Sequence, residues 1–361
     1  MKKILAKILI IILILSILAG CEKKPVYNKY EDTFFGTFDT VITVIGYAKT
    51  KEEFSSYMDT IKDRFEELHK LYDKYHNYEG INNIKTINDR AGLEPVRVEK
   101  EILEMIIFSK EWYHKAGEET NIAMGPVVNL WQKYMDEGIE NPDKAQLPPM
   151  ESLEELAQYT DIEKVLVDEE NSTIYLEDEN MVLDVGAVAK GYATEIVARE
   201  IEEAGFVSAL ISAGGNIRAI GKPLDNIRER WGVGIRNPDP ELIKTDSNLL
   251  ETVFVNGASV VTSGDYERFY TVDGKNYHHI IDPKTLMPGD YYRAITIVTP
   301  DSGLADFLST SVFLLPLEES KALVESLDDV EAFWVMKDGT IEVSSGMDKI
   351  MLSKGASGKD K

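Results

Sequence analysis

Apolar residues recur along this chain with two spacings, and each spacing predicts one kind of element. Apolar and polar residues alternate from Phe34 to Tyr47, which predicts a strand. Over residues 51–75 the apolar residues fall three or four positions apart, as on one face of an amphipathic helix. We expect further helices over about 99–116 and 151–159, after Gly186, and beyond Pro300. Short strands are expected near 164–168, 173–177, 181–186, 207–213, 231–236, 252–256 and 294–298.

This order of elements lacks a steady alternation of strands and helices, so the predicted fold class is α+β. We expect mixed or antiparallel sheets with packed helices in one unit over residues 33–350, with a cleft between two sub-regions. A polar tail is expected over 351–361.

The densest group of polar side chains falls between Thr262 and Pro283. A turn is expected at 262–265, and Asp273-Gly274 predicts a hairpin. His278 and His279 follow, and neighbouring side chains of a strand point to opposite faces, so only one of them can readily face a given cleft. Each histidine has two interpretations, a structural residue or a catalytic one.

The first twenty residues have the pattern of an export signal. Three lysines precede a long apolar run, and Leu18-Ala19-Gly20-Cys21 reads as a lipobox. Cleavage before Cys21 and lipidation of its sulfur would make the chain an extracytoplasmic lipoprotein held on the cell membrane. An uncleaved anchor helix is the alternative. Cys21 is the only cysteine, which excludes an intramolecular disulfide, and residues 21–32 are expected to form a polar tether.

The charge of the chain limits its partners. The formal net charge is −24, and removal of Lys2, Lys3 and Lys7 with the signal would make it −24 − 3 = −27. Such a chain is a poor candidate for nucleic-acid binding, which depends on Lys and Arg. An anionic ligand would need a local positive source, such as a metal ion or a helix N-terminus. Lys190, in the first turn of a predicted helix, is either a solvated lysine or part of such an anion site.

Asp306 and Thr310 are four residues apart in a predicted helix and therefore lie on the same face. A carboxylate and a hydroxyl are hard oxygen ligands that suit Mg²⁺ or Ca²⁺. The alternative is that Asp306 only caps the helix or interacts with its dipole.

Several motifs, in this order, resemble the ApbE family of FAD:protein FMN transferases. They cover nearly all of residues 34–337, and they are F-F-G-T (34–37), G-P-V-V-N-L-W (125–131), L-D-V-G-A-V-A-K-G-Y-A (183–193), S-A-G-G-N-I (212–217), T-S-G-D-Y (262–266), Y-H-H-I-I-D-P (277–283) and A-D-F-L-S-T (305–310). The resemblance implies an ApbE-like fold and Mg²⁺-dependent transfer of FMN from FAD to a Thr or Ser hydroxyl of an acceptor protein. The products would be a phosphoester-linked flavin and AMP.

The resemblance also implies roles for particular residues. Asp306, Thr310 and the carbonyl of Ala187 would bind Mg²⁺, with Ser309 as a further candidate, and His279 would be the catalytic base. Many members of the family have Asp where this chain has Asn121. The residues expected to contact FAD are Phe35, Tyr75 in the Tyr72–Tyr75 segment, Asn121, Lys190, Ser263 and Ile280.

Two other functions use the same residues. An FAD pyrophosphatase would hydrolyse FAD to FMN and AMP, with water in place of the acceptor hydroxyl. A lipoprotein that only binds a flavin or another solute would need no metal. Covalent flavin on a peptide, free FMN, or unchanged FAD would distinguish these three.

Overall fold

The computed structural model describes residues 25–245 and 247–359. The predicted signal and the predicted lipidation site, Cys21, lie outside the described residues. In the described part no helix combines the length and the apolar character needed to cross a membrane.

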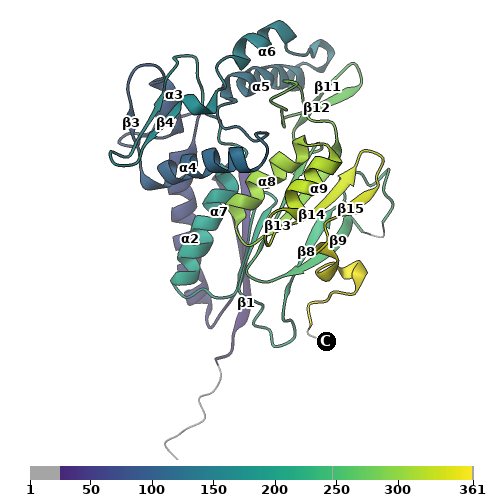
Figure 1. The fold of residues 1–361 in the computed structure, drawn as a ribbon. Coiled ribbons are helices and arrows are strands. Elements are labelled where there is room, and N and C mark those ends of the chain that lie inside the picture. The colour runs from purple at the N-terminus through teal and green to yellow at the C-terminus, as the bar shows by residue number, and fades with distance from the viewer. Residues whose placement is uncertain (1–24, 246, 360–361) are drawn as a thin grey trace, which may run out of the picture.

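An eight-stranded antiparallel sheet forms the centre of the molecule (Figure 1). Its neighbouring strands pair antiparallel throughout, as expected for strands joined without regular βαβ crossovers. In spatial order the strands are β1 (Asn28–Thr37), β2 (Thr40–Ala48), β6 (Ala209–Ala213), β7 (Asn216–Ile220), β10 (Ser259–Gly264), β13 (Tyr292–Thr299), β14 (Glu331–Met336) and β15 (Ile341–Val343).

Helices cover one face of this sheet. In α2, Thr50 caps the N-terminus, and residues at helical spacing from Phe54 to Leu68 are buried, which confirms the predicted amphipathic helix. These helices and the inward-facing strand residues form the largest apolar core. The helices are α2 (Lys51–Tyr72), α4 (Lys100–Lys115), α7 (Ala189–Glu203), α8 (Ser302–Leu314) and α9 (Leu317–Glu325).

A hairpin of β8 (Trp231–Arg236) and β9 (Leu249–Val255) packs on the opposite face and has its own core with the sheet. The C-terminal segment contacts this hairpin: Met351 bridges to Val253, and Ser353 bonds to Glu251. Residues 351–358 are therefore docked, in contrast to the free polar tail that we expected, because Met351 is apolar and Ser353 meets a buried carboxylate.

A second sub-region lies beyond one end of the sheet (Figure 1). Here Trp131 and Met135 of α5 (Gly125–Glu140) pack with Leu153 of α6 (Met150–Ala157) and Tyr270 of β11 (Phe269–Val272). β11 pairs with β12 (Lys275–His278) around Asp273 and Gly274, both with positive φ, which confirms the predicted hairpin. The remaining elements near this end are α3 (Ile84–Asp89), β3 (Val96–Arg97), β4 (Val165–Asp168) and β5 (Thr173–Leu176).

Four details differ from the sequence-based expectations. The stretch expected to be one strand from residue 34 is two strands joined at Phe38-Asp39, where φ is 52° and 49°. Because a two-residue turn does not interrupt the alternation of apolar and polar residues, the pattern looks like one strand. This turn also lacks the Asn-Gly or Asp-Gly pair that usually marks a hairpin. β1 also starts at Asn28, so residues 28–32 belong to the sheet and not to a tether.

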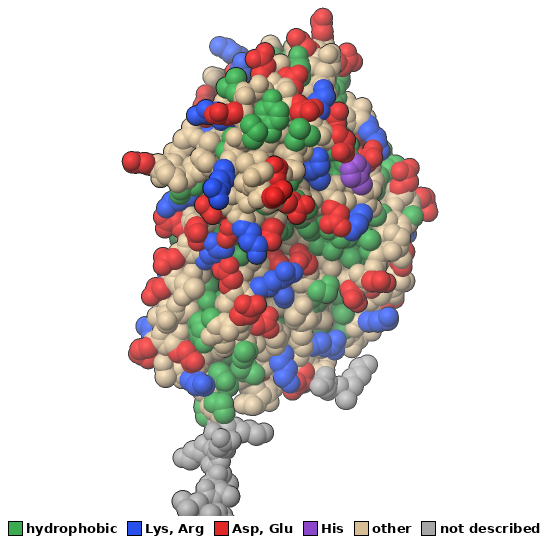
Figure 2. Space-filling view, turned by 60° about the vertical axis from the view of Figure 1, so that its left-hand side comes forward, with side chains coloured by type: hydrophobic (Ala, Val, Ile, Leu, Met, Phe, Trp, Pro, Cys, Tyr) green, Lys and Arg blue, Asp and Glu red, His purple; other side chains and the backbone are tan. Residues whose placement is uncertain are grey.

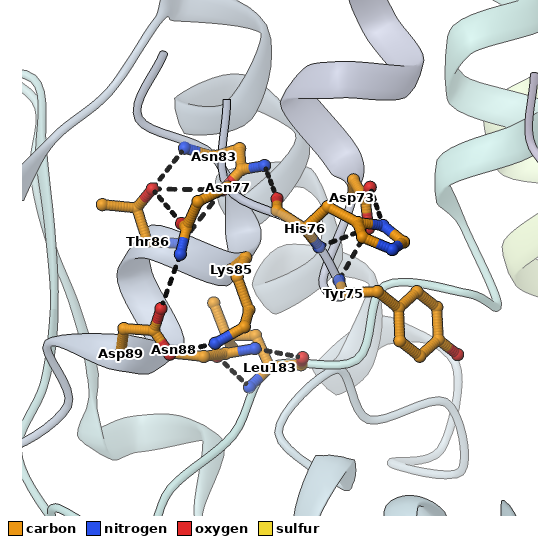
Figure 3. Close-up of polar contacts among 10 residues, drawn as sticks. All are labelled: Asp73, Tyr75, His76, Asn77, Asn83, Lys85, Thr86, Asn88, Asp89 and Leu183. Carbon is orange, nitrogen blue, oxygen red and sulfur yellow. Dashed lines mark hydrogen bonds and ion pairs between the residues drawn. The ribbon is translucent and has the colours of Figure 1, made fainter. Parts of the chain in front are cut away.

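Residues 181–186 do not pair with a strand. The backbone of Leu183 is held by the side-chain amide of Asn88, which donates to its carbonyl (3.0 Å) and accepts from its N–H (2.7 Å), as Figure 3 shows. Side-chain bonds thus replace the strand ladder. The expected turn at 262–265 is also different, since residues 262–264 are the end of β10.

Candidate active site

A cleft of about 540 Å³ lies where the two sub-regions meet. Met124 and Ile281, from the core around α5, lie in its wall together with Tyr72 and Leu314 from the core around α8. Most of the residues predicted for the site line this cleft. They are Tyr75, Asn121, Ala187, Lys190, Ser263, His279, Ile280, Asp306 and Thr310.

Three oxygen atoms, two on α8 and one just before α7, could hold a hard cation. Asp306 accepts the N–H of Gly191 through Oδ2 (2.7 Å). Gly191 is in the first turn of α7, where backbone N–H groups have no partner within the helix. Ala187 lies just before this helix, and no hydrogen bond to its carbonyl occurs in the described part of the chain. The hydroxyl of Thr310 likewise has no partner among residues 25–245 and 247–359. A carboxylate, a hydroxyl and an unbonded carbonyl fit the ligand chemistry of Mg²⁺.

Gly191 explains why the two helices come this close. A Cβ at position 191 would lie 2.4 Å from the Cβ of Asp306 and 2.4 Å from the carbonyl oxygen of Ser302. Any larger residue would therefore push α8 away from α7. The glycine thus positions the carboxylate of Asp306 beside the start of α7.

Ser309 is placed differently from Asp306 and Thr310. It is fully buried, its hydroxyl donates to the carbonyl of Asp306 (2.8 Å), and it also contacts the hydroxyl of Ser263 (2.7 Å). Ser309 therefore links α8 to β10 behind the cleft wall. This placement favours a packing role for Ser309 over that of a metal ligand.

The two histidines point to different sides, as the strand geometry predicted. His278 is buried, and its Nε2 donates to the carbonyl of Gly289 (2.7 Å) while its Nδ1 accepts the N–H of Ile280 (3.2 Å). Its ring meets Phe313 edge-on at 5.5 Å. Burial lowers the pKa of His278 to about 4, so the ring is neutral at neutral pH.

His279 is the histidine that faces the cleft. Its Nδ1 lies 3.3 Å from the carbonyl oxygen of Arg268. A carbonyl can only accept, so Nδ1 carries the hydrogen and the lone pair of the neutral ring is on Nε2. This is the tautomer that a general base needs.

The surroundings of His279 keep that ring neutral. Solvent reaches the ring from the cleft, but the surrounding protein disfavours the charged form and lowers the pKa of His279. The nearby positive charges of Arg268 and Lys190 act in the same direction. His279 can therefore accept a proton at neutral pH without first losing one.

A tight loop after α2 forms one end of the cleft. The buried carboxylate of Asp73 accepts the N–H of Tyr75 (2.6 Å), contacts Nδ1 of His76 (3.0 Å) and accepts the hydroxyl of Tyr78 (2.7 Å). Figure 3 shows that the ring of Tyr75 points away from this network. It is 58% exposed and lines the cleft, so a fixed loop presents an exposed aromatic ring.

The side chain of Lys74 is held at this end of the cleft by two polar partners. Its ammonium bonds to Asp184 (2.5 Å) and Asn129 (2.8 Å) and lies 5.0 Å from the centre of the Tyr75 ring. This contact was not predicted from the sequence, because Lys74 and Asp184 are 110 residues apart. The L-D-V-G motif was a signal for Asp184, but nothing local pointed to its partner.

Two predicted ligand contacts are placed less directly. Asn121 lines the cleft, but its amide donates to the carbonyl of Thr160 (2.8 Å) and its oxygen accepts the N–H of Ala123 (2.8 Å). Phe35 is 72% exposed on the outer side of the β1–β2 hairpin and is not part of the wall. Phe38, in the turn of this hairpin, lines the cleft in its place.

Comparison with known proteins covers most of the chain. Residues 38–334 match the sequence model of the ApbE family. The chain is 32% identical over 265 residues to an FAD:protein FMN transferase of Klebsiella pneumoniae, a match that covers 73% of this chain and 78% of that protein. It is 33% identical over 276 residues to an FAD:protein FMN transferase of Treponema pallidum, with 73% of each chain covered.

Solved structures share the fold. The ApbE protein of Thermotoga maritima superposes with a TM-score of 0.75 at 24% identity, over 90% of this chain and 99% of that one. The apo flavinyl transferase ApbE of Pseudomonas stutzeri gives a TM-score of 0.72 at 20% identity, over 90% and 97% of the two chains. These similarities confirm the expected α+β architecture.

Proposed function

The chain belongs to the ApbE family, and from this membership we propose that it is an FAD:protein FMN transferase. The reaction would move FMN from FAD to a Thr or Ser hydroxyl of an acceptor protein and release AMP. The observation that carries this proposal is the shared wall of one cleft, where Asp306, Thr310 and Ala187 lie together with His279. A cation site and a base on one cleft suit transfer of a phosphoryl-linked group.

Mg²⁺ is the proposed metal of this site. The carboxylate of Asp306, the hydroxyl of Thr310 and the carbonyl of Ala187 would hold it. When bound, the ion would neutralise charge on the FAD diphosphate. In a chain of net charge −24, such local compensation is needed for an anionic substrate, and Figure 2 shows acidic side chains spread over the surface with basic ones among them.

The protein's own groups have separate tasks. Nε2 of His279 would take the proton of the acceptor hydroxyl as its oxygen attacks the FMN phosphorus. Tyr75 offers an aromatic face to one planar ring of FAD, and Lys190 offers a positive charge near the start of α7. Ser263 and Ile280 lie in the wall beside His279 and would complete the FAD contacts.

One incubation tests the proposal. The purified protein is mixed with FAD, Mg²⁺ and a peptide that carries an acceptor Thr, and the peptide is examined for covalent flavin fluorescence and for the added mass of FMN. We expect labelled peptide and one AMP for each flavin attached. Removal of Mg²⁺ by a chelator, or the substitution Asp306→Asn, should reduce labelling by at least roughly 10²-fold.

The other outcomes identify the competing functions. Free FMN and AMP without labelled peptide would show an FAD pyrophosphatase, and unchanged FAD would show a binding protein. The matched control is Asp338→Asn, which removes one carboxylate from an exposed turn outside the cleft and should leave labelling unchanged.

We also propose that the protein works outside the cytoplasmic membrane as a lipoprotein attached through Cys21. The lipobox and the lysine-rich start of the apolar run support this location. The acceptor would then be a protein that is exposed on the same side of the membrane.

A further inference from the structure

Arg268 presents a positive charge in the cleft. Three basic side chains line the cleft, Lys74, Lys190 and Arg268. Lys74 is paired with Asp184. Within residues 25–245 and 247–359, the guanidinium of Arg268 has neither a hydrogen bond nor an ion pair, not even with Glu267 beside it. What distinguishes this arginine from other unpaired ones is its place in the wall of the cleft.

The backbone ties Arg268 to His279. The carbonyl of Arg268 accepts both the N–H of His279 (3.2 Å) and its Nδ1–H (3.3 Å). Phe269 and His278 are the last pair of the β11–β12 ladder, and Arg268 and His279 lie directly beyond it, still joined by this backbone hydrogen bond. Both of these residues line the cleft.

The start of this segment is anchored. The carboxylate of Asp265 is almost completely buried and forms ion pairs with Lys337 (3.0 Å) and Arg293 (3.2 Å), and its backbone N–H donates to the carbonyl of Arg293 (3.0 Å). Arg293 and Lys337 are thereby neutralised. The guanidinium of Arg268, in the same segment, has no such ion pair with any residue that the structure describes. His279 and Arg268 can therefore contact a ligand from the same side of the cleft.

The chemistry of the proposed reaction has a place for such a group. The oxygen of the acceptor hydroxyl bonds to the FMN phosphorus, and its proton moves to Nε2 of His279. The bond from that phosphorus to the bridging diphosphate oxygen breaks, and the electron pair leaves with AMP. During the step, charge is spread over the two non-bridging oxygens of the FMN phosphorus, and a planar guanidinium can bind both of them.

We propose that Arg268 is a catalytic residue that binds the non-bridging oxygens of the transferred FMN phosphoryl group. This inference rests on the proposed function. Because His279 must lie beside the attacking oxygen, its neighbour Arg268 reaches the phosphorus under attack more directly than the distant phosphate of AMP. The guanidinium binds these oxygens most strongly in the transition state, where the negative charge is spread over both of them. Loss of Arg268 should therefore lower mainly kcat.

The test compares Arg268→Gln and Arg268→Lys with the wild type at saturating FAD and acceptor peptide. We expect kcat for flavin transfer to fall by roughly 10²-fold or more in Arg268→Gln. Arg268→Lys keeps the charge but not the two-pronged donor and should lie in between. Inhibition by free FMN should weaken in Arg268→Gln, whereas inhibition by AMP should not change.

The control is Arg90→Gln, which removes an exposed arginine that is paired with Glu94 outside the cleft. It should behave like the wild type, and melting temperatures should show that all variants fold. Arg268→Gln with a wild-type kcat would overturn the inference. So would a defect that disappears at high acceptor concentration, because Arg268 would then hold the acceptor and not the phosphorus. If the wild type itself transfers no flavin, the proposed function fails first.

Discussion

The neighbouring residues His278 and His279 have opposite environments, and this difference separates stability from catalysis. His278 has both ring nitrogens bonded to backbone groups and lies against Phe313, whereas Nε2 of His279 is available in the cleft. Two residues of the same type can therefore be tested against each other.

We expect His279→Ala to lower kcat by roughly 10²–10⁴-fold, because the acceptor proton loses its base. Its free energy of unfolding should stay within about 0.5 kcal/mol of the wild type, since the side chain is exposed. His278→Ala should instead lose about 2–4 kcal/mol of stability, because it leaves backbone groups unpaired and a cavity beside Phe313. Urea unfolding and single-turnover flavin transfer measure the two effects. Loss of kcat in both variants without loss of stability would contradict the assignment.

The buried His278 also predicts how stability depends on pH. Its pKa is about 4 in the folded protein and about 6.5 in the unfolded chain, so between these values only the unfolded chain binds the proton. The contribution of His278 to stability is complete above pH 6.5 and is lost as the pH falls toward 4, by roughly 3 kcal/mol. Unfolding in urea from pH 7 to pH 4 should show this loss, and His278→Asn should show a shallower slope. Equal slopes would mean that His278 does not titrate in this way.

At the scale of elements, the close contact of α7 and α8 determines the geometry of the proposed metal site. We expect Gly191→Ala to destabilise the protein by about 1–3 kcal/mol, because the new Cβ would overlap the Cβ of Asp306 and the Ser302 carbonyl. Activity should fall further than stability explains, since Asp306 must move. Gly303→Ala is the matched comparison: the atoms nearest its Cβ would be side-chain atoms of Tyr192 and Asp301 and the Cα of Tyr192, at 3.0–3.2 Å, so its effect should be smaller. If Gly191→Ala and Gly303→Ala changed stability and the Mg²⁺ concentration needed for activity to the same extent, the proposed metal site would be contradicted.

The sequence predicted elements best where one face is buried over several turns. The helix over 51–75 corresponds to α2, and the hairpin at Asp273-Gly274 corresponds to β11–β12, because period and turn residues are local signals. The turn at Phe38-Asp39 escaped prediction because its residues rarely adopt positive φ. The segment 181–186 looks like a strand because its alternate residues are buried, although its backbone partners are Asn88 and Ile122.

The site was predictable to a similar extent. Motif residues such as Asp306, Thr310 and His279 come together in one cleft, as the resemblance implied. The tautomer of His279, the unbonded carbonyl of Ala187 and the unpaired guanidinium of Arg268, as seen within residues 25–245 and 247–359, depend on how distant segments are placed. Such placements leave no periodic pattern in a single sequence.

At the scale of the whole molecule, the lipoprotein proposal makes a prediction about the mature chain. In membranes of producing cells, the N-terminal residue should be Cys21 carrying a lipid mass. Cys21→Ser should prevent lipid addition and should leave residues 1–20 attached, which intact-mass analysis detects. A wild-type protein that keeps residues 1–20 would support an uncleaved anchor helix instead.

The direction of β1 has a consequence for the choice of acceptor. The strand runs from Asn28 to Thr37, and the turn that follows it lines the cleft, so its ten residues separate the start of the fold from the site by roughly 30 Å. With a lipid at Cys21, the cleft would therefore lie at the end of β1 remote from the anchored terminus. Acceptors that present the flavin-bearing hydroxyl away from the lipid surface would suit this arrangement best.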